Sequence, residues 1–157
     1  MNRFVKWGLI IILIICFIGV GSYFIYKNII GQRQEKISQE PTKKQKEIMD
    51  TDFLKEEDIK PEDLDSETEI YNMIHEMANT KIVAEDGMIW GLKPITKSRV
   101  AAVIKALEEQ GINDAKLNKI MERWSVEDFR DCVDDHNYVW GKYLDGNIGK
   151  AVKLREK

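Results

Sequence analysis

The sequence predicts a mainly α-helical protein made of one N-terminal transmembrane helix, a charged linker, and a small domain of about four helices with a short β-hairpin. Three observations predict this class. A run of residues near the N-terminus carries no charge, the middle of the chain is strongly charged, and apolar residues repeat at helical spacing after residue 69. We place the parts at residues 1–6 (basic tail), 7–26 (transmembrane helix), 27–68 (flexible linker) and 69–157 (soluble domain).

The segment WGLIIILIICFIGVGSYFIY, residues 7–26, is long enough to cross a bilayer. At about 1.5 Å of rise per residue it spans about 30 Å, the thickness of the hydrocarbon core. Trp7 at one end and Tyr26 at the other suit the two interfacial belts. A cleaved signal peptide is the alternative, because Gly19-Val20-Gly21 offers small residues at cleavage spacing. The run stays apolar past this point, which favours an uncleaved anchor.

The charges around this segment favour two opposite orientations. Arg3 and Lys6 lie in a very short basic tail, which is typical of a signal anchor that leaves the rest of the chain outside. Six Lys and Arg residues between positions 27 and 46 favour a cytoplasmic C-terminal side. We predict a single-pass protein of the cell membrane with its N-terminus in the cytoplasm and its C-terminal domain outside. A cytosol-facing membrane adaptor is the alternative.

The linker has a basic and an acidic half. Residues 1–46 carry eight Lys/Arg and two Asp/Glu, whereas residues 47–69 carry eleven Asp/Glu and two Lys. A segment with such high charge and low hydrophobicity does not offset the entropy lost on ordering. We therefore predict a spacer, with local docking through Phe53 and Leu54 as an alternative. Residues 70–157 carry fourteen charges of each sign, a balance that gives no footprint for nucleic acid.

The first two helices of the soluble domain are predicted from their caps. Ser66-Glu67-Thr68-Glu69 has the form of a capping box, and the helix after it should end near Asn79. Thr96 is a candidate cap for the second helix, which should stop at Gly111. The apolar faces are Ile70, Met73, Ile74 and Met77 in the first helix, and Val100, Val103, Ile104 and Leu107 in the second.

The third and fourth helices follow the same logic. Asn113 or Asp114 can cap the third helix, and residues 125–128 should cap the fourth. Their apolar faces are Leu117, Ile120, Met121 and Trp124 in the third, and Phe129, Cys132, Val133, His136 and Trp140 in the fourth. With no disulfide framework, the domain's three tryptophans are expected to serve the core.

Two short apolar runs, residues 82–84 and 88–90, flank Glu85-Asp86-Gly87. An Asp-Gly step between such runs predicts a β-hairpin. A two-stranded hairpin is only marginally stable alone, so this one must lean on the helices. A short final helix is predicted at residues 150–155.

The stretch DDHNYVWG, residues 134–141, invites a catalytic interpretation. His136 shares a helical stripe with Trp140, whereas Asp134 and Asp135 are rotated from it by about 100° to 200° and should face water or the domain edge. A histidine on an apolar face is typical of a core residue with one satisfied nitrogen. We therefore predict no catalytic residue and no cofactor.

The alternative is a small, hydrolase-like enzyme of the cell envelope that uses His136 with Asp135 or His75. The spacing does not place these residues, or Cys132, together, and no HxxxH or HExxH pair indicates a metal site. We predict instead a membrane-anchored binding module. Its expected partners are the bilayer through residues 7–26 and another envelope protein or a cell-wall polymer.

The segments MANTKIVAEDGMIWG, PIT, MERWSVEDF, DDHNYVWG and GNIGKA resemble a family of small single-span membrane proteins of unknown function from endospore-forming Gram-positive bacteria. The resemblance covers roughly residues 70–152 and implies a location and a shared fold but no reaction. In that family a histidine usually stands where this chain has Asn79, which puts histidine-dependent chemistry there in doubt. The resemblance points to six residues that form either a shared surface or a shared core: Asp135, His136, Asn137, Trp90, Trp124 and Trp140.

Overall fold

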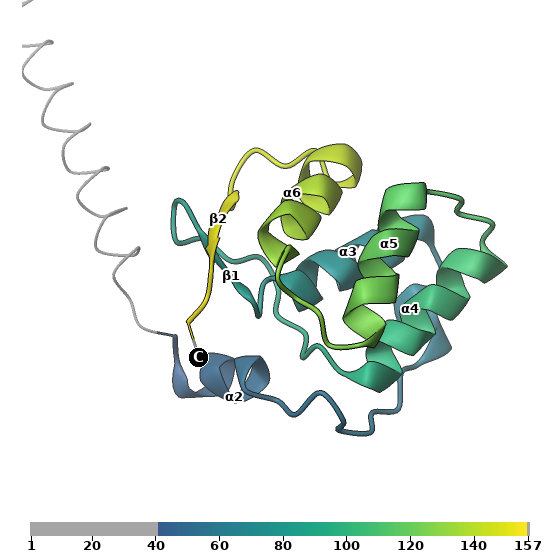
Figure 1. The fold of residues 1–157 in the computed structure, drawn as a ribbon, viewed down its shortest axis with the longest axis horizontal. Coiled ribbons are helices and arrows are strands. Elements are labelled where there is room, and N and C mark those ends of the chain that lie inside the picture. The colour runs from purple at the N-terminus through teal and green to yellow at the C-terminus, as the bar shows by residue number, and fades with distance from the viewer. Residues whose placement is uncertain (1–40, 157) are drawn as a thin grey trace, which may run out of the picture. The chain divides into compact units, whose positions relative to one another are not determined.

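The computed structural model describes residues 41–156, so the predicted basic tail, the transmembrane helix and the first part of the linker lie outside the described residues. The described elements are α2 (Lys43–Met49), the 3-10 helix η1 (Pro61–Leu64), α3 (Glu67–Ala78), β1 (Ile82–Ala84), α4 (Lys97–Glu109), α5 (Ala115–Ser125), α6 (Cys132–Tyr143) and β2 (Ala151–Leu154). Within this part the fold is mainly helical with a two-stranded antiparallel sheet (Figure 1). The predicted mainly α-helical class is therefore confirmed for the described residues. None of the helices between residues 41 and 156 combines the length and the hydropathy that a bilayer span needs.

The helix α3 packs against α6, α4 and η1 (Figure 1). Ser66 caps it as predicted: its Oγ accepts the backbone N–H of Glu69 at 3.4 Å and donates to Glu69 Oε2 at 2.8 Å. The helix ends at Asn79, also as predicted. Its predicted apolar face is buried: Ile70, Met73, Ile74 and Met77 are at most 5% exposed.

The predicted start and end of α4 and the predicted start of α5 are confirmed. Thr96 caps α4 and Asp114 caps α5, each through a side-chain oxygen that accepts backbone N–H groups. Gly111 has a φ of +66°, and the N–H of Ile112 bonds the carbonyl of Leu107 at 2.9 Å. This is the bond that closes a Schellman motif, which needs a left-handed residue at the glycine position.

The fourth helix starts later than the sequence predicts. Ser125 ends α5 instead of capping α6, and Glu127 has a φ of +62°, which no residue inside a right-handed helix adopts. The carboxylate of Asp128 binds Arg130. The chain therefore turns here, and α6 begins only at Cys132.

The predicted β-hairpin is wrong, and so is the predicted final helix. The strand β1 pairs not with residues 88–90 but with β2 at the end of the chain. The pairing is antiparallel and sets Ile82 opposite Leu154 and Val83 opposite Lys153. The segment predicted as a final helix is thus the second strand of the sheet.

Two asparagine side chains explain this pairing. Asn79 Nδ2 donates to the carbonyls of Trp90 at 3.0 Å and Gly91 at 3.1 Å, which ties residues 90–91 to the end of α3. Asn137 on α6 acts like a peptide group toward Ala151: its Nδ2 donates to the Ala151 carbonyl, and its Oδ1 accepts the Ala151 N–H, both at 2.9 Å. The amide of Asn137 thereby holds β2 beside α6.

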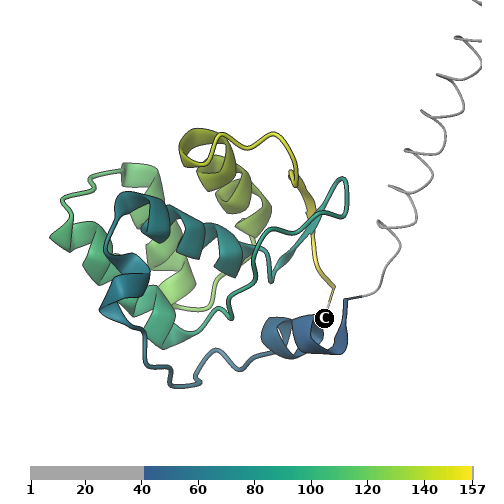
Figure 2. The ribbon, with the colours of Figure 1, turned by 180° about the vertical axis from the view of Figure 1, so that it is seen from behind.

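The described part of the predicted linker carries helices and contributes to the core. Phe53 and Leu64 are buried, in line with the docking alternative, whereas Leu54 is 68% exposed. The compact unit therefore includes residues well before 69. The end of α2 lies near the end of β2, because Met49 and Leu154 line the same hollow (Figures 1 and 2).

Candidate functional site

The structure brings the two histidines of the chain together. His75 comes from α3 and His136 from α6, and their ring centroids are 4.6 Å apart with an angle of 39° between the planes. His75 is 7% exposed and His136 is fully buried, so the predicted core position of His136 is confirmed. The sequence spacing did not indicate this pair, because it forms only when α3 packs on α6.

The hydrogen bonds of His136 fix its tautomer. Because Asn137 is oriented by its two bonds to Ala151, its Oδ1 is the acceptor that lies 3.2 Å from His136 Nδ1. The Nδ1 atom therefore carries the proton and donates. The Nε2 atom is then a buried acceptor, and no residue between 41 and 156 donates to it.

Both rings are held neutral at neutral pH. Burial, and then the proximity of His136, lower the pKa of His75 from 6.5 to about 4. Burial also lowers the pKa of His136, against the opposing effect of the Asn137 oxygen. A neutral imidazole can act as a base or a metal ligand, but this pair faces the core between two helices.

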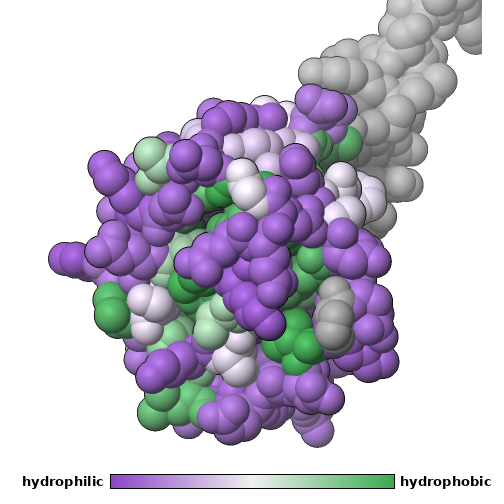
Figure 3. Space-filling model, turned by 90° about the vertical axis from the view of Figure 1, so that its right-hand side faces the viewer, coloured by the Kyte–Doolittle hydropathy of each residue, from purple (hydrophilic) through white to green (hydrophobic). Residues whose placement is uncertain are grey.

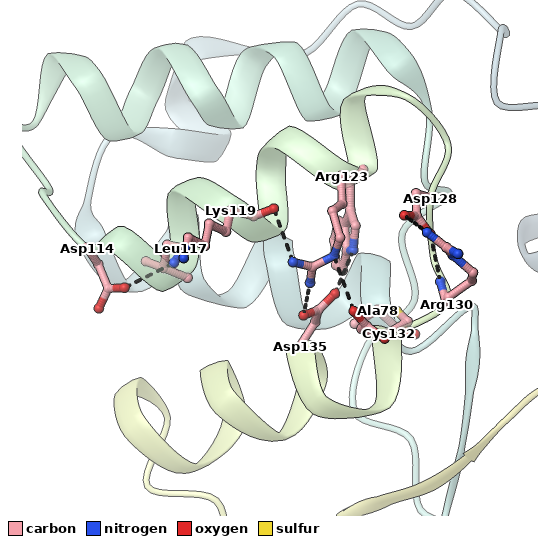
Figure 4. A network of polar contacts seen from close by, with 11 residues as sticks. Ala78, Asp114, Leu117, Lys119, Arg123, Asp128, Arg130, Cys132 and Asp135 are labelled. Carbon is pink, nitrogen blue, oxygen red and sulfur yellow. Dashed lines mark hydrogen bonds and ion pairs between the residues drawn. The ribbon is translucent and has the colours of Figure 1, made fainter.

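Asp135 does not face water, contrary to prediction. It is 2% exposed, accepts a hydrogen bond from Trp124 Nε1 at 3.0 Å, and forms an ion pair with Arg123 (Figure 4). Its neighbour Asp134 is exposed, as predicted. The prediction failed because α6 packs against α3 and also meets Arg123 and Trp124 of α5, so its buried arc is wider than one apolar stripe.

The other ionisable side chains near the histidine pair are held inside the fold. Burial raises the pKa of the Asp135 carboxyl, and its two donors limit that rise. Cys132 is fully buried with its Sγ 3.9 Å from the Ala78 carbonyl, and burial raises the pKa of its thiol far above the usual range. A thiol in this state is inert. Within residues 41–156 no cluster of three His, Cys, Asp or Glu side chains could hold a metal ion.

Sequence reasoning missed a second polar centre, around the cap of α5. Asp114 Oδ2 accepts from the hydroxyls of Tyr138 at 2.6 Å and Tyr143 at 2.5 Å, and from Lys142 Nζ at 2.5 Å. Burial acts to raise the pKa of Asp114, but the three donors outweigh it and hold this pKa well below its usual range. Tyr138 and Lys142 lie one turn apart on α6, and their spacing in the sequence shows this. The sequence does not show that Asp114 is their shared partner.

The three tryptophans of the domain differ in exposure. Trp124 is fully buried, as expected of a core residue. Trp140 is half-buried and donates from Nε1 to the Ile148 carbonyl at 2.8 Å. Trp90 was expected to lie in the core, but it is 59% exposed.

The exposed Trp90 sits on a loop that is held on two sides. On one side, the Lys93 N–H donates to the carbonyl of Glu76 on α3 at 3.2 Å, and Gly91, with a φ of +74°, lies so close to Glu76 that a β-carbon there would collide with its side chain. On the other side, the Gly149 N–H donates to Asp86 Oδ2 at 2.9 Å. The indole is therefore presented to solvent from a loop whose backbone is fixed.

Two open hollows lie elsewhere on the surface. The larger, of about 850 Å³, lies between α2, the α5–α6 loop and the end of β2. The smaller, of about 490 Å³, lies where α4 and α5 meet the loop that joins them. On the face shown in Figure 3, hydrophobic residues come to the surface between hydrophilic side chains. Neither hollow contains the histidine pair.

The comparisons with known proteins give one match. A family model described as a family of unknown function, DUF6241, matches residues 74–157, which is more than half of the chain. Neither a curated protein nor a solved structure matches the chain.

Proposed function

Since the chain belongs to the DUF6241 family of unknown function, we propose a role from the arrangement of its own segments. The protein is a membrane-anchored, extracytoplasmic module that binds another protein of the cell envelope. The apolar run at residues 7–26 supplies the anchor, with the N-terminus in the cytoplasm. The observation that carries the proposal is the exposed Trp90 on its fixed loop. A cell-wall polymer is the alternative partner.

Trp90 has the properties of a binding residue. Large aromatic side chains dominate the energetics of protein interfaces, and they do so best when little ordering entropy is lost on binding. The bonds from Asn79 to the carbonyls of Trp90 and Gly91 meet this condition before any partner arrives. Further apolar surface lies close by, because Gly149 packs beside the Trp90 ring and its neighbour Ile148 is 40% exposed.

The side chains of Asp135, His136 and Asn137 favour a binding module over an enzyme. Asp135 and His136 are buried, and Asn137 is bonded to Ala151, so their side chains are committed to the fold. An enzyme that used His136 with Asp135 would need both to reach a substrate. Asp135 instead accepts a hydrogen bond from Trp124 and pairs with Arg123.

Replacing Trp90 by a photo-crosslinking amino acid in the full-length chain is expected to capture an envelope protein in cells. The matched control is the same replacement at Val126, which is 75% exposed on the α5–α6 loop. The adducts are separated by mass after irradiation. A protein adduct specific to position 90 supports the proposal, a carbohydrate adduct moves it to the wall polymer, and equal yields at both positions contradict it.

Fusion of a topology reporter after residue 157 is expected to show the C-terminal domain outside the cytoplasm. A pair of reporters decides this, one active only in the cytoplasm and the other only outside it. Activity of the cytoplasmic reporter alone would contradict the proposal and favour an adaptor on the inner face, as the six Lys and Arg residues of the linker suggest.

A further inference from the structure

The segment 51–60, which we call the strap, lies across the start of α4. The carbonyl of Phe53 accepts the backbone N–H of Lys97 at 2.8 Å, and the N–H of Glu57 donates to Ser98 Oγ at 3.2 Å. The first N–H groups of a helix have no partner within the helix. The strap supplies one of these partners from outside.

Two side chains seat the strap. Phe53 is buried and meets the ring of Phe129 edge-on, with centroids 5.9 Å apart. Glu57 Oε2 accepts from Thr96 Oγ1 at 2.7 Å and lies 3.2 Å from Arg99 Nη1. Between and after them, Leu54, Lys55, Glu56 and Asp58 are exposed.

The receiving surface pairs the Glu57 carboxylate with a buried cation, Arg99, whose Nη1 also donates to the Pro94 carbonyl at 2.6 Å. Arg99 is only 8% exposed, and its Nε is buried without a partner in the described part of the chain. A buried guanidinium requires an anion, and the start of a helix adds favourable partial charge. Thr96 both caps α4 and donates to the bound carboxylate. Phe129 contacts the ring of Phe53.

The family match covers the receiving surface but not the strap. Thr96, Ser98, Arg99 and Phe129 all lie within the family match at residues 74–157, whereas the strap lies before it. The strap is also rich in charge, and it joins α2 to η1.

We propose that the surface under the strap, formed by the start of α4 and Phe129 and here called the groove, is a binding site for acidic peptides. These peptides carry an aromatic residue four positions before a carboxylate. The strap occupies the site in cis as a displaceable latch. A tethered segment acts at an effective concentration in the mM range, so the latch masks the site against free peptides. A partner peptide of the same chemistry takes the groove when the strap leaves. The proposal depends neither on the membrane anchor nor on Trp90.

Hydrogen exchange on the wild-type full-length chain tests the latch. The Lys97 amide is bonded to Phe53, whereas the amides of Ile74 and Met77 in α3 report opening of the core. If the strap opens by itself, Lys97 exchanges at least about 100-fold faster than the α3 amides while retaining protection. Exchange at the α3 rate would show that the strap opens only with the whole domain. Exchange without any protection would show that it is not seated. Either result overturns the proposal.

A labelled peptide of residues 51–60 tests the groove. The receptor is the full-length chain carrying Phe53→Ala and Glu57→Gln, and the control receptor carries Leu54→Ala and Glu56→Gln at exposed neighbours. Fluorescence anisotropy should show binding to the first receptor at least about tenfold tighter than to the control or the wild type. A peptide carrying Phe53→Ala and Glu57→Gln should not bind. Equal binding to all receptors, or none to a folded first receptor, refutes the groove. If that receptor does not fold, the exchange experiment decides.

Discussion

Replacing Asp135 by alanine is expected to lower the free energy of unfolding by about 3 kcal/mol or more. The change leaves the Arg123 guanidinium without its buried partner and Trp124 Nε1 without an acceptor. Breaking a buried ion pair from one side costs about 3–5 kcal/mol, because the remaining charge is uncompensated. The side chain of Arg123 is 28% exposed and keeps an ion pair with Asp131 at 3.8 Å, which favours the lower end of that range. Urea unfolding of the full-length chain measures the loss.

The neighbouring residue provides the control for this prediction. Asp134 follows the same turn of α6 but is exposed, so Asp134→Ala should change the stability by no more than about 0.5 kcal/mol. Asp135→Asn should fall between the two, since it keeps an acceptor for Trp124 and loses the charge. Equal urea midpoints for Asp134→Ala and Asp135→Ala would show that the buried network does not stabilise the fold.

The helices were predictable wherever local chemistry determines them. Ser66, Thr96 and Asp114 bond N–H groups within three residues of themselves, and Gly111 adopts its left-handed conformation at the end of the same helix that it terminates. Such signals need no knowledge of the rest of the chain. The start of α6 lacks a side-chain cap, and its prediction failed accordingly.

The sheet and the candidate site depend instead on contacts between distant segments. The Asp86-Gly87 turn was recognisable, since the Gly87 N–H does bond the Ala84 carbonyl at 3.1 Å. Its continuation is determined by Asn79 and Asn137, which belong to two other elements. The burial of Asp135 likewise requires α5 beside α6. A single helical stripe predicts one buried face, and it fails for a helix that packs against two neighbours.

Acidification is expected to destabilise the domain through the histidine pair. In the unfolded chain His75 takes up a proton below its ordinary pKa of 6.5, but in the folded chain it does so only below about 4. Between these values the unfolded state binds more protons, so the free energy of unfolding falls as the pH falls. At about 1.4 kcal/mol for each unit, His75 contributes a loss of about 3 kcal/mol. The loss from this group is complete near pH 4, and burial of His136 adds to it in the same direction.

The matched variant His75→Gln isolates this contribution. Burial raises the pKa of Glu76 and of Asp135, so these carboxyls protonate first in the folded state and oppose the histidines as the pH falls. Both carboxyls remain in the variant, and the difference between the two pH profiles therefore reports the histidine alone. The unfolding free energy of the wild type should fall more steeply than that of His75→Gln between pH 6.5 and 4. Parallel profiles would mean that protons reach the ring without opening the contact between α3 and α6, and the pair would then carry no acid sensitivity.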